Sequence, residues 1–356
     1  MPKHIGIPRA ISYYNNYPFY YGFFKSLGIE VILSDKTTAK TINDGSKYVV
    51  SDTCLPIKVY VGHVINLLDK GCDAIFVPSL QSTGYKINNC SKVRGLPEII
   101  RNILPQNFTM IEPTLDKTEN IDLKNFCKQT ANAFDICDEQ KIKKAIDEGF
   151  KVYNSFMEMT KAGVCYKEAL DSAINGKTVK KTIDIVKPIS VAIMAHGYNL
   201  FDEKISLNLI KKLEKMNVKV YTSLNVSFDE AIKSIDEIGE VQYWANEPEL
   251  TGTAAYYLLN KKVDGIIALS AFGCGPDSLM ADEIYYHCKE RKVPFIHITI
   301  DEHSGEAGFV TRIEAFIDML LRKKRNSIIK NADLNKKSVA PVINIKKEKI
   351  LTTSIK

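Results

Sequence analysis

Several common sequence patterns are absent from this 356-residue chain. It has no run of about 18 apolar residues, so we expect no transmembrane helix and no membrane partner. The first residues, MPKHIGIPRAISYY, lack the apolar region of a signal peptide, which favours a cytoplasmic location. No G-x-G-x-x-G follows the first predicted strand, and no G-x-x-x-x-G-K-[ST] occurs. The chain therefore has neither a dinucleotide-binding fingerprint nor a P-loop for ATP hydrolysis.

The positive charge of the chain is concentrated at its end. The net charge is +6, but Arg322–Lys356 contains eleven Lys and Arg against two Asp and Glu, which is +9, and leaves −3 for the other 321 residues. A nearly neutral body does not indicate nucleic-acid binding. We interpret the tail as a solvated segment; the alternative is an electrostatic docking tail for nucleic acid or an acidic partner.

Short β-branched runs alternate with longer amphipathic segments, which is typical of an α/β fold. We predict two doubly wound, mainly parallel-sheet domains that face each other across a cleft and are joined by a helical connector. The predicted parts are an N-terminal α/β domain (1–118), the connector (119–187), a C-terminal α/β domain (188–325) and a basic, loosely ordered tail (326–356) with one short apolar run, VAPVINI. The clearest predicted strands are 29–34, 73–80, 108–113, 218–223, 264–273 and 293–300, and the clearest helices 13–28, 55–71, 92–104, 122–134, 139–174, 279–291 and 307–324.

The eight cysteines include no C-x-x-C pair, and a cytoplasmic chain is not expected to form disulfides. In parallel sheets, binding sites form beyond the carboxyl ends of the strands. Three cysteines lie there, each before a predicted helix: Cys54, Cys90 and Cys274. The others lie at the opposite edge or in the connector and are interpreted as structural thiols: Cys72, Cys288, Cys127, Cys137 and Cys165.

A thiol at a helix N-terminus is expected to have a lowered pKa. Thiolates are the ligands that iron–sulfur clusters and soft metals require, so the three cysteines are a candidate metal site. If they hold one cluster, their sulfurs should lie within roughly 6–7 Å of one another. The alternative is that each cysteine is a small apolar residue filling a turn, and the spacing matches no local metal motif.

Other polar side chains are predicted at the same edge. Asp301, Glu302, His303 and Glu306 follow the strand 293–300, and His303 with Glu302 or Glu306 is a candidate acid–base pair. Helix capping and solvation of a loop are the alternative. A cysteine hydrolase that uses Cys274 with His303 is a further hypothesis, although GCGPDS lacks the last glycine of a nucleophile elbow.

Six segments together resemble a known family. They are IGIPRAISYYNNYPFYYGFFKSLG, DTCLPIKVYVGHV, NCSKVRGLPEIIR, AHGYNLFD, SAFGCGPDS and HITIDEHSGEAGFVTRIEAFIDML. The chain resembles the acyl-CoA dehydratase activase-related proteins, which are relatives of the 2-hydroxyacyl-CoA dehydratase subunits and of the double-cubane cluster proteins. The resemblance spans about Ile5 to Leu321 and is weakest in the helical connector.

The resemblance implies α/β domains around an iron–sulfur cluster held by three cysteines, which match Cys54, Cys90 and Cys274. It also implies a separate ATP-hydrolysing activase that delivers low-potential electrons. In the dehydratases one such electron makes a ketyl radical of the acyl-CoA thioester, and one iron stays open for water or substrate. We favour a single 4Fe–4S cluster over a double-cubane cluster, which needs more thiolates than three at one edge.

The sequence therefore predicts an iron–sulfur protein of anaerobic metabolism that receives electrons from an activase. Its chemistry would be reductive or radical, on a small molecule such as a 2-hydroxyacyl-CoA. As an enzyme it would be a lyase or a component of an ATP-dependent reductase. The dehydratases have two different subunits, so a homologous second subunit or a second copy is expected. The alternative is a non-catalytic binding or scaffold module with empty or zinc-bound thiols.

Overall fold

Two four-stranded parallel sheets form the framework of the protein. The computed structural model describes residues 4–72, 74–82, 87–104, 108–179, 187–241, 243–245 and 248–338, with side chains as far as residue 329. The strand orders are β2-β1-β3-β5 and β10-β9-β7-β8, and every pairing within them is parallel. The bounds are β1 His4–Ile7, β2 Glu30–Leu33, β3 Ala74–Phe76, β5 Thr109–Ile111, β7 Ile189–Met194, β8 Val218–Tyr221, β9 Gly265–Ala271 and β10 Phe295–Ile300. The predicted α/β class with mainly parallel sheets is confirmed.

The central strands are apolar because both of their faces are covered. All seven residues of β9, GIIALSA, are buried, and five of the six in β7 are buried as well. Such continuous apolar runs are typical of parallel strands with helices on both sides.

The single predicted strand 73–80 is divided in two. Pro78, which has no N–H to donate, separates β3 from β4 (Ser79–Ser82), and β4 pairs with β6 (Thr114–Asp116) in a separate two-stranded sheet.

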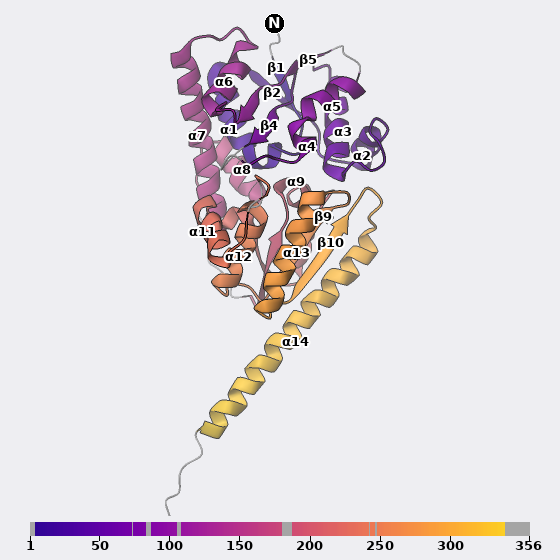
Figure 1. Ribbon diagram of the computed structural model, residues 1–356, viewed down its shortest axis with the longest axis vertical. Coiled ribbons are helices and arrows are strands. Elements are labelled where there is room, and N and C mark those ends of the chain that lie inside the picture. Colours follow the sequence, from indigo (N-terminus) through magenta and orange to yellow (C-terminus); the bar gives the residue numbers. More distant parts are fainter. Residues whose placement is uncertain are drawn as a thin grey trace, which may run out of the picture.

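The helices surround the sheets and join the two halves of the molecule. Figure 1 shows α7 along one side of both halves, α4 and α9 near their boundary, and α14 extending far from the body.

The predicted helical segment 139–174 is two helices, because Gly163, with φ +90°, separates α7 from α8. The bounds are α1 Tyr13–Leu27, α2 Ala39–Ser46, α3 Leu55–Asp69, α4 Ser91–Arg94, α5 Leu96–Ile103, α6 Leu123–Asn132, α7 Glu139–Lys161, α8 Tyr166–Ile174, α9 Gly197–Leu200, α10 Leu209–Lys215, η1 Ser223–Asn225, α11 Phe228–Ile238, η2 Pro248–Gly252, α12 Thr253–Leu259, α13 Gly275–Glu290 and α14 Glu306–Ser338.

The two halves share one apolar core. The cluster that contains Ile57 and Val61 of α3 also contains Val191 of β7 and Ile267 of β9, all at most 2% exposed. The halves therefore meet over a packed apolar interface. The domain boundaries at 118, 187 and 325 remain predictions.

Helix α14 is longer than predicted. The sequence predicted loosely ordered chain from residue 326, but the described chain stays helical to Ser338. The sequence has no glycine or proline between Gly308 and Pro341, so nothing in it ends the helix earlier. The apolar run 339–345 lies outside the described residues. In the part of the chain that the structure describes, no helix has the length and apolar character needed to span a membrane.

Candidate functional site

The three cysteines selected from the sequence each cap a helix. Cys54 precedes α3, Cys90 precedes α4 and Cys274 precedes α13, all with extended backbone angles. Proline stands at the first positions of α3 and α13, where its fixed φ suits the first turn. The local sequence therefore sets each helix start immediately after the cysteine.

The loop before α13 packs against the start of α3. Gly273 has φ +75°, in the left-handed region that favours glycine. A Cβ at Gly273 would lie 3.3 Å from the carbonyl oxygen of Asp52 and 3.7 Å from Cα of Cys54. The absence of a side chain lets the two loops approach, and it brings Cys274 close to Cys54.

The charges of the three thiols act on one another. Burial raises the pKa of Cys54, Lys92 opposes this, and Cys90 and Asp277 raise the pKa further. Burial also raises the pKa of Cys274, and Asp277 and Cys54 add to the increase. The lowered thiol pKa predicted from helix N-termini is therefore wrong for Cys54 and Cys274, because burial outweighs the helix dipole.

The other five cysteines do not cap helices near this site. Three are buried (Cys72, Cys127 and Cys288) and two are exposed (Cys137 and Cys165), and all eight cysteines are free thiols. Among the described residues, no group of three or more His, Cys, Asp or Glu side chains is placed to hold a single metal ion.

A buried histidine lies between two carboxylates beside this site. Nδ1 of His196, which caps α9 directly after β7, is 3.0 Å from Oε2 of Glu249, and Nε2 is 3.0 Å from Oδ1 of Asp277. The side chains of His196 and Asp277 are each 2% exposed. Burial alone lowers the pKa of His196, but Asp277 and Glu249 outweigh it and raise the pKa to about 10. His196 is therefore an imidazolium at neutral pH.

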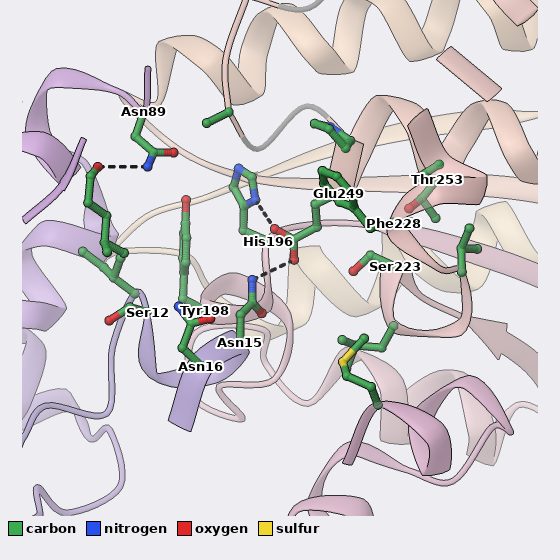
Figure 2. A pocket seen from close by; sticks show the side chains of 18 of the residues that line it. Ser12, Asn15, Asn16, Asn89, His196, Tyr198, Ser223, Phe228, Glu249 and Thr253 are labelled. Carbon is green, nitrogen blue, oxygen red and sulfur yellow. Dashed lines mark hydrogen bonds and ion pairs between the residues drawn. The ribbon is translucent and has the colours of Figure 1, made fainter. Parts of the chain in front are cut away.

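A cavity of about 350 Å³ lies on the Glu249 side of His196. Its walls come from α1, α7, α9, α11 and η2, so both halves and the connector contribute. Figure 2 shows His196, Glu249 and Asn15 joined by hydrogen bonds, with Tyr198 nearby. The pKa of Tyr198 is raised by burial and then by Asp277, Cys274 and Cys90. Tyr198 therefore lines the cavity and also lies within electrostatic range of Cys274 and Cys90.

The predicted acid–base residues are held in other contacts. Glu302 forms an ion pair of 2.5 Å with Lys58 of α3, and Glu306 forms one of 2.7 Å with Lys212. His303 is exposed, and its backbone N–H donates to Asp301. Both carboxylates are thus paired with lysines, and His303 contributes to the lowered pKa of Glu302. The acid–base role of these residues stays a prediction.

Two family models together match most of the residues of the chain. The model described as the CoA enzyme activase uncharacterised domain matches residues 4–226, more than half of the sequence. The chain belongs to this family. A second model, the 2-hydroxyglutaryl-CoA dehydratase D-component, matches residues 253–320. These matches confirm the suspected family resemblance and support a dehydratase-related role. No curated protein is matched by the chain.

The site of this CoA enzyme activase-domain protein draws on both matched regions. Cys54, Cys90 and His196 lie in the first match, and Cys274 and Asp277 in the second. The sequence offered a weak signal for His196, which directly follows the apolar run ISVAIMA, and for Asp277, which follows Cys274. Glu249 lies between the two matches, and no pattern in the sequence distinguished it.

Proposed function

We propose that this protein is a dehydratase-related iron–sulfur protein in which Cys54, Cys90 and Cys274 hold one 4Fe–4S cluster. The proposal is supported by the packing of the Gly273–Cys274 loop, in one matched region, against Cys54 in the other. The influence of Cys90 on the pKa of Cys54, and of Cys54 on that of Cys274, supports it further. The cavity beside Tyr198 is the binding site for the small molecule on which the protein acts.

The residues fit such a group. All three thiols are free, and a cluster holds its thiolates further apart than a single ion does, because several iron atoms lie between them. Glycine at position 273 removes a side chain next to Cys274, where bulky inorganic sulfide would need space. Three ligands leave one iron open, and a bound cluster would supply low-potential electrons to the small molecule.

The residues of the chain itself have separate tasks in this proposal. Tyr198 lines the cavity within electrostatic range of Cys274 and Cys90, and the buried pair His196–Asp277 fixes the first turns of α9 and α13 relative to each other. Electrons come from an ATP-hydrolysing activase, since this sequence has no P-loop. A homologous subunit or a second copy completes the assembly, and the reaction is that of a lyase or of a reductase component.

Iron and acid-labile sulfide analysis of anaerobically purified protein tests the proposal. We expect about four iron atoms per chain and the broad visible absorption of a 4Fe–4S cluster. Replacing Cys54, Cys90 or Cys274 by serine should remove the iron, and the matched controls Cys72→Ser and Cys288→Ser should keep it. Iron-free protein after reconstitution, or loss of iron in the controls alone, refutes the proposal.

The same experiment separates the alternatives. Bound zinc without iron would indicate the binding or scaffold module. A hydrolase that uses Cys274 needs a thiolate paired with a base. Burial and Asp277 raise the pKa of Cys274, which disfavours the thiolate. The described contacts of His303 do not include Cys274. The geometry therefore favours the cluster.

A further inference from the structure

The cavity between the two halves presents one carboxylate, Glu249, to its interior. The Glu249 side chain is 18% exposed, whereas the side chain of Asp277, the other carboxylate on His196, is 2% exposed. Asp277 is not among the residues that line the cavity. Glu249 and His196 are therefore the parts of this charged group that line the cavity, and Glu249 is the more exposed of the two.

Glu249 is held in a fixed orientation. Oε2 faces Nδ1 of His196 at 3.0 Å, and Oε1 accepts a hydrogen bond of 3.3 Å from Asn15 of α1. Each carboxylate oxygen can accept more than one hydrogen bond, so both retain acceptor capacity toward the cavity. Figure 2 shows Glu249 between His196 and Asn15 in the wall.

The charge of Glu249 is not cancelled inside the cavity. His196 is a single imidazole that faces two carboxyl groups, so it can pair with the charge of only one of them. Among the described residues that line the cavity, none is lysine or arginine. The Glu249 charge also reaches the opposite wall on α7, where burial and then Glu249 raise the pKa of Tyr153.

The remaining polar lining consists of uncharged groups. Hydroxyls come from Ser12, Ser223 and Thr253, and amides from Asn16 and Asn89. Apolar side chains such as Met157 and Phe228 cover the rest. This is the composition of a small-molecule site that orients its ligand by a few hydrogen bonds and excludes water with apolar surface.

We propose that this cavity selects a molecule whose buried end is a hydrogen-bond donor, either an uncharged amide or hydroxyl or a protonated amine, and that Glu249 accepts from it. An anionic end is rejected, because it would be desolvated beside a carboxylate, and the imidazole of His196, which also lines the cavity, already faces two carboxylates. The inference rests on the proposed function in treating the cavity as the substrate site. If the substrate is an acyl-CoA, its acyl chain ends in a neutral or amine-bearing group and not in a carboxylate.

Binding of three matched probes to the full-length protein tests this selection. Pentylamine, pentanamide and pentanoate have the same chain length and differ in the charge of one end, and their dissociation constants can be measured at pH 7 by saturation-transfer NMR. We expect the amine and the amide to bind at least roughly tenfold more tightly than pentanoate. Iron content is measured on the same samples, so that a failure of the proposed function is seen separately.

Variants assign the preference to Glu249. Glu249→Gln should remove the advantage of the amine over pentanoate, and Ser223→Lys, which adds a cation to the lining, should reverse it. The control Glu98→Gln, at an exposed position on α5, should behave as the wild type. Tighter binding of pentanoate, equal binding of all three probes, no binding of any probe, or an unchanged preference in a folded Glu249→Gln protein overturns the inference. A cluster-free protein that keeps the charge preference refutes the proposed function alone.

Discussion

The side chain of His196 is buried and held at both of its ring nitrogens. It is 1% exposed, and carboxylates face both of its ring nitrogens at 3.0 Å. Two carboxylates against one imidazole favour the protonated ring strongly enough to overcome its burial. The position of His196 between β7 and α9 ties the end of the second sheet to α13 through Asp277 and to η2 through Glu249.

This ion pair predicts a pH dependence of stability. The folded pKa of His196, about 10, lies above its ordinary 6.5, so its stabilisation is complete below pH 6.5 and is lost as the pH rises through 10. The free energy of unfolding of wild type minus that of His196→Gln should fall over this range by on the order of 3–5 kcal/mol. Urea unfolding of both proteins at pH 6, 8 and 10 measures this difference in the free energy of unfolding.

His63 provides the control for this measurement. Burial lowers its pKa to about 3, so it is neutral in the folded protein throughout the same range. The unfolding free energies of wild type and His63→Gln should differ by a nearly constant amount between pH 8 and 10. Parallel curves for wild type and His196→Gln would show that His196 is not charged in the folded protein.

At the scale of the elements, glycines determine how closely helices pack. A Cβ at Gly62 of α3 would lie 1.9 Å from the carbonyl oxygen of Thr41, and one at Gly45 of α2 would lie 1.9 Å from that of Lys58. The two helices therefore touch backbone to backbone through both glycines. Gly22 of α1 and Gly149 of α7 form a similar contact, in which a Cβ at Gly22 would lie 2.6 Å from the Glu148 carbonyl oxygen.

Alanine substitutions of glycine should have opposite effects at two helical positions. Gly62→Ala forces α2 away from α3, and we expect a loss of about 2–4 kcal/mol in the free energy of unfolding. Gly308 of α14 has nothing within 4 Å of a built Cβ, so Gly308→Ala should stabilise the helix by about 0.5–1 kcal/mol. Urea denaturation measures the free energy of unfolding of both variants and of the wild type. Equal changes in the two variants would contradict the backbone contact between α2 and α3.

At the scale of the whole molecule, polar contacts join the two halves around the shared core. Lys58 of α3, with a side chain 6% exposed, donates to Glu302 after β10 at 2.5 Å and to the Ser51 carbonyl oxygen at 2.9 Å. Tyr14 of α1 donates to Asp202 at 2.8 Å. In the second half, Asp202 and Glu302 lie on either side of Cys274 in the sequence, so the two contacts tie both flanks of that cysteine to the first half.

Removing the Lys58 ammonium should weaken this junction. Lys58→Met leaves Glu302, whose side chain is 21% exposed, without its cation, and the expected loss is about 2–4 kcal/mol. Lys47→Met removes an ammonium group from a side chain that is 69% exposed and should cost less than about 1 kcal/mol. The midpoints of urea unfolding measure the loss of stability in both variants. Faster amide hydrogen exchange at residues 299–303 in Lys58→Met alone would show that the weakening is centred on the Glu302 loop. Equal losses in the two variants would show that the Lys58 pair does not join the halves.

The sequence by itself determined the class of fold, several helix starts and the three cysteines selected before predicted helices, because hydrophobic periodicity, proline at first turns and glycine at helix ends act locally. Helix α1, which ends at Gly28 with φ +78°, and helix α3, which begins after Cys54, were predicted in this way. The tertiary structure alone decided the partners of each ionisable group. Glu302 forms an ion pair with Lys58 and not with His303, and Glu249 pairs with His196. These contacts depend on how two distant segments pack together, and they leave no periodic pattern in the sequence of either segment.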